Sequence, residues 1–168
     1  QRLSLLGDGP RDAPTRQQTL AAAIGWSYDL LTPEAQRLFC RLTTFSGGFT
    51  VEAAQAVASD PQASHHVVVR GLTALVDHSL IYRMDRADAP RFSILETIRE
   101  FGLERLTASE EATAARDRHA AYFLTLVQSL DAWVAAYLPD AQEILDRLET
   151  EYPNMRVALA WLRETGEV

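Results

Sequence analysis

The side chains best suited to chemistry are sparse in this sequence, and their spacing does not assemble a catalytic or metal site. Among the histidines, His65 and His66 are adjacent and would point about 100° apart on a helix, while His78 and His119 lie far away in the sequence. This spacing does not fit a zinc site. Cys40 is the only cysteine, so no internal disulfide can form, and no histidine lies near it in the sequence to activate the thiol. We interpret Cys40 as a small buried apolar residue.

The charged residues exclude further classes of enzyme. The acidic pairs Glu110-Glu111 and Glu149 with Glu151 could serve acid–base catalysis, but an expected helix start and a polar helix face explain them as capping and solubilising groups. All 16 basic residues are arginine. Without lysine the chain can contain neither a Walker A phosphate loop nor a Schiff-base nucleophile. We predict that this chain is not an enzyme by itself.

Charge and hydropathy also limit the environment of the protein. The formal net charge of −7 argues against non-specific binding to nucleic acid, although a local basic face remains possible. The longest apolar run is Ala132 to Leu138, far below the roughly 18 residues that a membrane span needs. The first residues lack the apolar core of a signal peptide. We expect a cytoplasmic protein without a membrane partner.

The apolar periodicity predicts a mainly α-helical fold with one β-hairpin. The first helix starts near Thr19, with Leu20, Ala23, Ile24, Ser27 and Leu31 on one face. Capping signals mark the next helix starts, Thr32-Pro33 for the second and Thr50 for a short third that ends near Ser59. A fourth helix follows over about 65–79, and alternating residues predict strands over 80–84 and 91–95.

The pattern returns to helix after the hairpin. A helix over 96–106 is followed by a break at 107–111, where Ser109 is the expected cap, and by a long helix that stops at Leu138-Pro139. Two shorter helices complete the chain, one over about 141–148 and one starting near Pro153. The tryptophans fall on apolar stripes, so we expect them in the core, although an exposed one could anchor a partner: Trp26, Trp133 and Trp161.

This order of elements predicts two structural units. Helices followed by a two-stranded hairpin and another helix, within about 90 residues, are typical of a winged helix, which we place at 17–107. Residues 108–168 form a helical unit of TPR-like character, the start of a helical array that is truncated here. Residues 1–16 contain Gly7, Gly9, Pro10 and Pro14 and form a linker or domain edge.

Several blocks of uncommon residues resemble one bacterial family in the same order. They are Arg16-Gln17-Gln18-Thr19-Leu20, Trp26-Ser27-Tyr28-Asp29-Leu30-Leu31, Gln36-Arg37-Leu38-Phe39, Phe45-Ser46-Gly47-Gly48-Phe49, Glu52-Ala53-Ala54, Leu75-Val76-Asp77-His78-Ser79-Leu80, Leu95-Glu96-Thr97-Ile98-Arg99-Glu100-Phe101 and Arg118-His119-Ala120-Ala121-Tyr122-Phe123. The pattern is similar to the segment downstream of the NB-ARC core in STAND-type ATPases that act as LuxR-type or SARP-type transcriptional regulators, AfsR-like proteins among them. The resemblance covers about residues 16–162.

The resemblance implies a regulatory role in signal transduction. In that family the winged helix packs on the upstream ATPase core and reports its ATP or ADP state, and downstream helical repeats sense a protein or small-molecule effector. ATP or ADP and Mg²⁺ would then bind upstream, and this fragment would hold no cofactor. Ile94, Leu95 and Glu96 fall where plant and animal relatives carry a Met-His-Asp triplet, whose histidine contacts ADP. Because leucine replaces that histidine, direct phosphate sensing by this side chain is not expected.

Two functional hypotheses remain open. In the first, the chain couples the nucleotide state of the upstream core to the downstream sensor by a rigid-body movement, with an interdomain face at Arg83, Arg91, Leu95, Glu96 and Arg99. In the second, the winged helix itself contacts DNA, with Arg70 on the fourth helix and Arg83, Arg86 and Arg91 on the wing. In the first hypothesis DNA would be bound through another domain of the longer protein.

Overall fold

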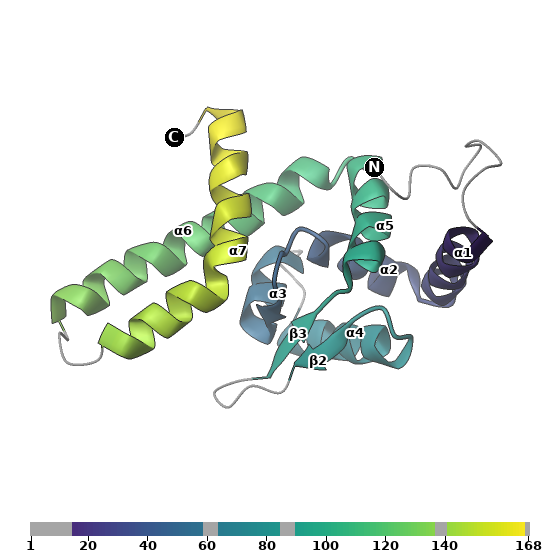
Figure 1. Cartoon of the computed structure of the whole chain (residues 1–168), viewed down its shortest axis with the longest axis horizontal. Coiled ribbons are helices and arrows are strands. Elements are labelled where there is room, and N and C mark those ends of the chain that lie inside the picture. The colour runs from purple at the N-terminus through teal and green to yellow at the C-terminus, as the bar shows by residue number, and fades with distance from the viewer. Residues whose placement is uncertain (1–14, 59–63, 85–89, 137–140, 167–168) are drawn as a thin grey trace.

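The computed structural model describes residues 15–58, 64–84, 90–136 and 141–166 (Figure 1). Within them the chain forms α1 (Thr15–Asp29), α2 (Pro33–Leu42), β1 (Phe49–Thr50), α3 (Val51–Ala58), α4 (His65–Asp77), β2 (Tyr82–Met84), β3 (Arg91–Ser93), α5 (Glu96–Thr107), α6 (Ala112–Ala136) and α7 (Ala141–Thr165). The predicted mainly helical fold with a β-hairpin, followed by a helical unit, is confirmed.

The small sheet contains one strand more than the sequence predicted. Its order is β1-β3-β2, and both pairings are antiparallel, with Phe49 opposite Phe92 and Arg83 opposite Phe92 on the other side. β1 has only two residues, too few to leave an alternating pattern. Thr50 also performs the predicted capping role, since its side-chain oxygen accepts a hydrogen bond from the Ala53 amide at 3.2 Å.

The predicted helix ends near α2 and α4 are confirmed. The Thr32 hydroxyl accepts a hydrogen bond from the Ala35 amide at 3.3 Å, and Pro33 opens α2. α4 ends at His78, after which Ser79 adopts a positive φ of 57°. The Leu80 amide then donates to the Leu75 carbonyl at 2.9 Å, which closes the helix in a Schellman motif and turns the chain into β2.

One aromatic cluster joins the winged helix to α6. Phe45 lies 4.8 Å from Phe49 of β1 and 6.2 Å from Phe123 of α6, measured between ring centroids. His119 of α6 lies between them, 5.0 Å from Phe45 and 4.8 Å from Phe123. All four side chains are almost completely buried, so the core continues across the break between α5 and α6. The division into units at 107 and 108 stays a prediction.

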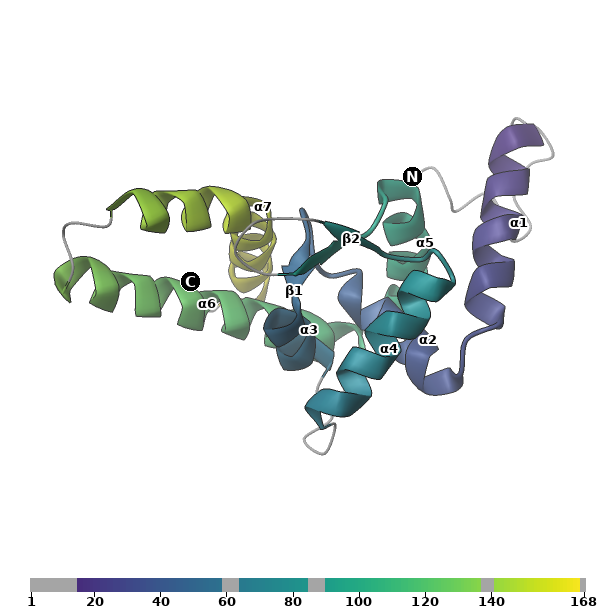
Figure 2. The same cartoon turned by 90° about the horizontal axis from the view of Figure 1, so that it is seen from below.

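The helix α1 differs from the prediction in its start and in its buried face. It begins at Thr15, before the predicted end of the linker. From Thr19 onward, where burial is described, its buried residues are Ala21 and Ile24, whereas Leu20 is 47% exposed and Trp26 is 68% exposed. The prediction that Trp26 belongs to the core is wrong. Because α1 lies at the end of the molecule opposite α6 and α7 (Figure 2), few elements are available to cover it.

The last helix, which carries Trp161, also differs from the prediction. Trp161 is half-buried, and its indole N–H donates to the Asp117 carboxylate at 2.7 Å, while the side chain of Trp133 lies outside the described residues. The two predicted terminal helices are a single helix, α7, with Pro153 inside it. Proline removes one backbone hydrogen bond, which bends a helix without necessarily ending it, and α7 is visibly bent in Figure 1. The predicted stop at Leu138-Pro139 lies outside the described residues.

The wing junction and the α4 surface as candidate functional sites

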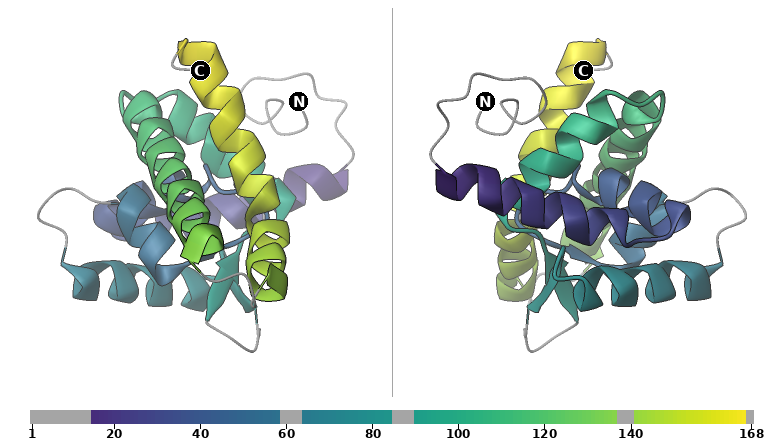
Figure 3. Two further views of the ribbon diagram at one scale, coloured as in Figure 1. Left: turned by 90° about the vertical axis from the view of Figure 1, so that its left-hand side faces the viewer. Right: turned by 90° about the vertical axis from the view of Figure 1, so that its right-hand side faces the viewer.

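The helix α4 occupies the place of a recognition helix in a winged helix. Its Val68, Leu72 and Leu75 are buried against the core, which leaves Arg70 and Thr73 exposed. α4 runs along one border of the molecule in both views of Figure 3. Arg70 makes no hydrogen bond or ion pair with any residue that the structure describes. Position and exposure thus suit DNA, but the face carries one arginine and the acidic Asp77.

The structure does not gather the predicted basic wing. Arg83 of β2 is exposed, and Arg86 lies outside the described residues. Arg91 of β3 is only 7% exposed, and its Nη1 donates to Glu151 Oε1 of α7 at 2.5 Å. Its Nη2 also donates to the Gly48 carbonyl at 3.4 Å. We expected this side chain at a solvent-exposed wing, but it joins the wing to α7. The sequence did not indicate the pairing, because the partner carboxylate lies 60 residues further along the chain.

We use the term wing junction for Ser46, Gly48, Arg91, Glu151 and Asn154. Asn154 is fully buried and accepts a hydrogen bond from the Ser46 amide at 2.7 Å. Its Nδ2 donates to the Gly48 carbonyl at 2.8 Å and to Glu151 Oε2 at 3.1 Å. Each polar group in this buried cluster thus finds a specific partner, which fixes α7 against the chain between α2 and β1.

Two glycines bring α7 and β3 close to that chain segment. Gly47 has φ 85°, and a Cβ there would meet the Pro153 ring at 2.9 Å. Gly48 has φ 101°, and a Cβ would meet the Phe92 carbonyl oxygen at 2.9 Å. Left-handed backbone and close approach both require glycine at these positions. The run Ser46-Gly47-Gly48, which the sequence predicts to be a break between helices, is therefore the segment that contacts α7 and β3 at the wing junction.

Leu95, Glu96 and Arg99 lie at the start of α5. Leu95 is 57% exposed, although it is apolar. Both carboxylate oxygens of Glu96 accept hydrogen bonds from Arg99, at 2.9 and 3.1 Å, and these bonds lower the pKa of the Glu96 carboxyl below its usual value. Arg99 also donates to the Thr43 carbonyl at 3.3 Å, which ties α5 to the end of α2. These three residues form a partly exposed surface, separate in its contacts from Arg91.

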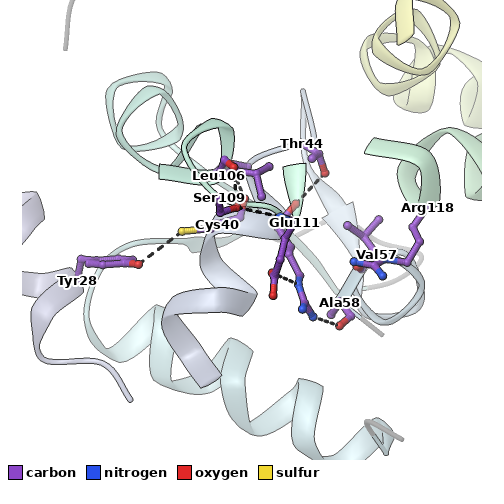
Figure 4. A network of polar contacts seen from close by, with 11 residues as sticks. Tyr28, Cys40, Thr44, Val57, Ala58, Leu106, Ser109, Glu111 and Arg118 are labelled. Atoms are coloured by element: carbon purple, nitrogen blue, oxygen red, sulfur yellow. Dashed lines mark hydrogen bonds and ion pairs between the residues drawn. The ribbon is translucent and has the colours of Figure 1, made fainter. Parts of the chain in front are cut away.

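A second polar network fastens α3 to α2 and α6 (Figure 4). Arg41 donates to Glu111 at 2.8 Å and to the Ala58 carbonyl at 2.6 Å, and Arg118 donates to the Val57 carbonyl at 3.0 Å. The hydrogen bond from Arg41 lowers the pKa of Glu111. From the sequence we interpreted Glu111 as a capping acid, because nothing in its local pattern indicates a partner 70 residues away.

Cys40 and His119 are two of the buried groups that could titrate. Burial raises the pKa of the Cys40 thiol, whose sulfur lies 3.6 Å from the Tyr28 hydroxyl, and the prediction of a buried Cys40 is confirmed. Burial lowers the pKa of His119 to about 4, because the charged imidazole loses its hydration, and the buried Nε2 has no hydrogen-bond partner among the described residues. Sequence reasoning gave His119 no role, although Ala115, His119 and Phe123 are spaced four residues apart and share one helix face.

The described residues also limit two other kinds of site. No three histidine, cysteine, aspartate or glutamate side chains among them lie close enough together to hold a metal ion. None of the described helices is both long and apolar enough to cross a bilayer.

The order α2-β1-α3-α4-β2-β3 and the three-stranded sheet define a winged helix. Residues 31–107 match the family described as a winged helix-turn-helix domain, so the chain contains such a domain. No solved structure matches the chain.

Two proteins named as regulators and one uncharacterized protein are similar to this chain over most of its length. The chain is 43% identical over 164 residues, 98% of its length, to a Mycobacterium bovis protein named "Putative HTH-type transcriptional regulator", and equally to a Mycobacterium tuberculosis protein of the same description. It is 31% identical over 119 residues, 70% of its length, to an "Uncharacterized protein" of Mycobacterium bovis, of which it covers 30%. The chain spans only 18% of the regulators' length. The named relatives are described as regulators, not as enzymes.

Proposed function

We propose that this chain is a regulatory coupling module of a bacterial transcriptional regulator. The relatives named as transcriptional regulators support the regulatory part of the proposal. The observation that carries the coupling part is the buried Arg91–Glu151 ion pair, with Asn154 beside it. These contacts link the wing to α7. A displacement of α6 and α7 is therefore transmitted to the winged helix as movement of one rigid body.

The surface at the start of α5 would contact the upstream domain of the longer protein. Leu95 offers an exposed apolar side chain, and the Glu96–Arg99 pair offers charges of both signs. Arg83 on the wing would complete an interface with an upstream NB-ARC core that binds ATP or ADP with Mg²⁺. Arg91 has no place in that outer face, because it is buried. Downstream helical repeats would continue from α7, and the protein would act in the cytoplasm, where bacterial DNA lies.

The coupling can be tested by the cooperativity of unfolding. We would replace Trp26 and Trp133 by phenylalanine, so that Trp161 on α7 is the only indole, and follow urea unfolding by fluorescence and by circular dichroism. One rigid body predicts coincident transitions for the two signals. Two separate transitions in this otherwise unchanged chain would overturn the coupling, since α7 would then unfold independently of the winged helix.

Direct DNA binding is the second candidate function, favoured by the exposed Arg70 on α4, which has no hydrogen-bond or ion-pair partner among the described residues. Fluorescence anisotropy with a mixed-sequence duplex, at low and at physiological salt, distinguishes the two. The coupling module predicts no binding at either salt concentration. Binding that weakens steeply with salt and is reduced by Arg70→Gln, but not by the control Arg156→Gln on α7, would favour DNA contact by α4.

A further inference from the structure

A pocket of about 590 Å³ opens between α2 and α4, on the side of α4 that faces α2. Its volume falls within the range of pockets that hold small molecules in proteins. Its apolar lining includes Leu38 of α2 with Val68 and Ala74 of α4. None of these residues belongs to the wing junction or to the outer surface at Leu95, so the coupling function proposed above leaves this cavity without a role.

Three arginines line the same pocket, and the single acidic side chain among the lining residues is Glu34. Arg41 is already paired with Glu111 and the Ala58 carbonyl. Arg37 lies 3.8 Å from Glu34 in an exposed and therefore weak ion pair. Arg70 has no hydrogen-bond or ion-pair partner among the described residues. The rim therefore keeps positive charge for an external group, in a chain whose net charge is −7.

The helix pair that forms the pocket is closely packed at one side of it. A Cβ at Gly71 would lie 2.4 Å from Leu38 Cδ2, so α4 approaches α2 as closely as glycine allows. The buried side chains of both helices belong to the same core. The walls of the pocket are thus set by packed helices, and a ligand would not have to order a loop in order to bind.

We propose that this pocket binds a small organic anion with an apolar body, of the chemical class of aromatic carboxylates and sulfonates. The anionic group would lie between Arg70 and Arg37, and the apolar body would contact Leu38, Val68 and Ala74. The ligand would thereby contact α4 directly. The inference goes beyond the coupling function and does not depend on it.

The probe for this site is anilinonaphthalene sulfonate, a fluorescent aromatic anion, titrated into the full chain. We expect saturable binding to one site, weakened about tenfold or more by Arg70→Gln, because a charge-assisted hydrogen bond is lost. The matched control Arg156→Gln, on the exposed surface of α7, leaves the affinity unchanged. The neutral probe N-phenylnaphthylamine should bind the wild type more weakly than the anion does. Its affinity should be the same for the wild type and for Arg70→Gln.

A second variant, Ala74→Phe, fills the pocket and keeps every arginine. It should abolish probe binding, and amide chemical shifts on probe addition should map to α2 and α4. Shifts confined to α1 around the exposed Trp26, or an affinity that neither variant changes, would overturn the proposal. A third result would also overturn the proposal. In it, Arg70→Gln weakens binding of duplex DNA, whereas Ala74→Phe changes neither DNA binding nor probe binding. The arginines would then bind DNA phosphates.

Discussion

Replacing Glu151 by alanine should lower the free energy of unfolding by about 3–5 kcal/mol, the usual cost of removing one partner of a buried ion pair. The side chain of Arg91 is only 8% exposed, so its charge cannot turn to water when the carboxylate is gone. Among the described residues the Gly48 carbonyl at 3.4 Å is then its remaining hydrogen-bond acceptor, and Asn154 loses a hydrogen-bond acceptor as well. For a chain of this size the loss corresponds to a midpoint lower by about 6–20 °C.

The assay is urea unfolding followed by circular dichroism, with thermal unfolding as a second measurement. The control is Arg37→Gln in the exposed Glu34–Arg37 pair, which should leave the free energy of unfolding almost unchanged. The double variant Arg91→Met with Glu151→Leu should recover much of the loss, since it leaves no buried charge unpaired. A loss below about 1 kcal/mol for Glu151→Ala, or a double variant as unstable as the sum of the single ones, would refute the reasoning.

Three further predictions concern the buried core. The folded pKa of His119 lies below its unfolded value, so its contribution to stability is complete above pH 6.5 and is lost as the pH falls towards 4. Urea unfolding across that window should show a loss of about 3 kcal/mol that His119→Phe removes, and parallel profiles would contradict this. Asn154→Leu leaves the Ser46 amide without its acceptor and should cost about 2–4 kcal/mol; a thermal midpoint within 2 °C of the wild type, by calorimetry, would exclude such a cost. Gly102→Ala should destabilise by about 1–3 kcal/mol, since its Cβ would lie 2.4 Å from Thr43 Cγ2, whereas Gly25→Ala, with its nearest atom at 4.0 Å, should stabilise by about 0.5–1 kcal/mol. Equal shifts of the urea midpoint for the two glycine variants would disprove that difference.

The helix and strand assignments followed from local signals wherever the local residues themselves provide the stabilising contacts. Thr32 with Pro33 starts α2, and the run around His78 ends α4, because a cap needs only neighbours within a few residues. Strand β1 left no such signal, since its two residues are a strand only through pairing with β3. The continuous α7 was missed for the related reason that contacts on both sides of Pro153 hold the bent helix together.

The sequence by itself determined the mainly helical class, the hairpin, the lone buried thiol and the absence of lysine chemistry, because these depend on residue type and short spacing. The partners of charged side chains were decided only by the tertiary structure. Arg91 and Glu151 are 60 residues apart, and each has a local environment that would equally suit an exposed residue. Which charges are buried together, and which, like Arg70, are left facing a pocket, depends on how the helices pack, and no short-range pattern contains that information.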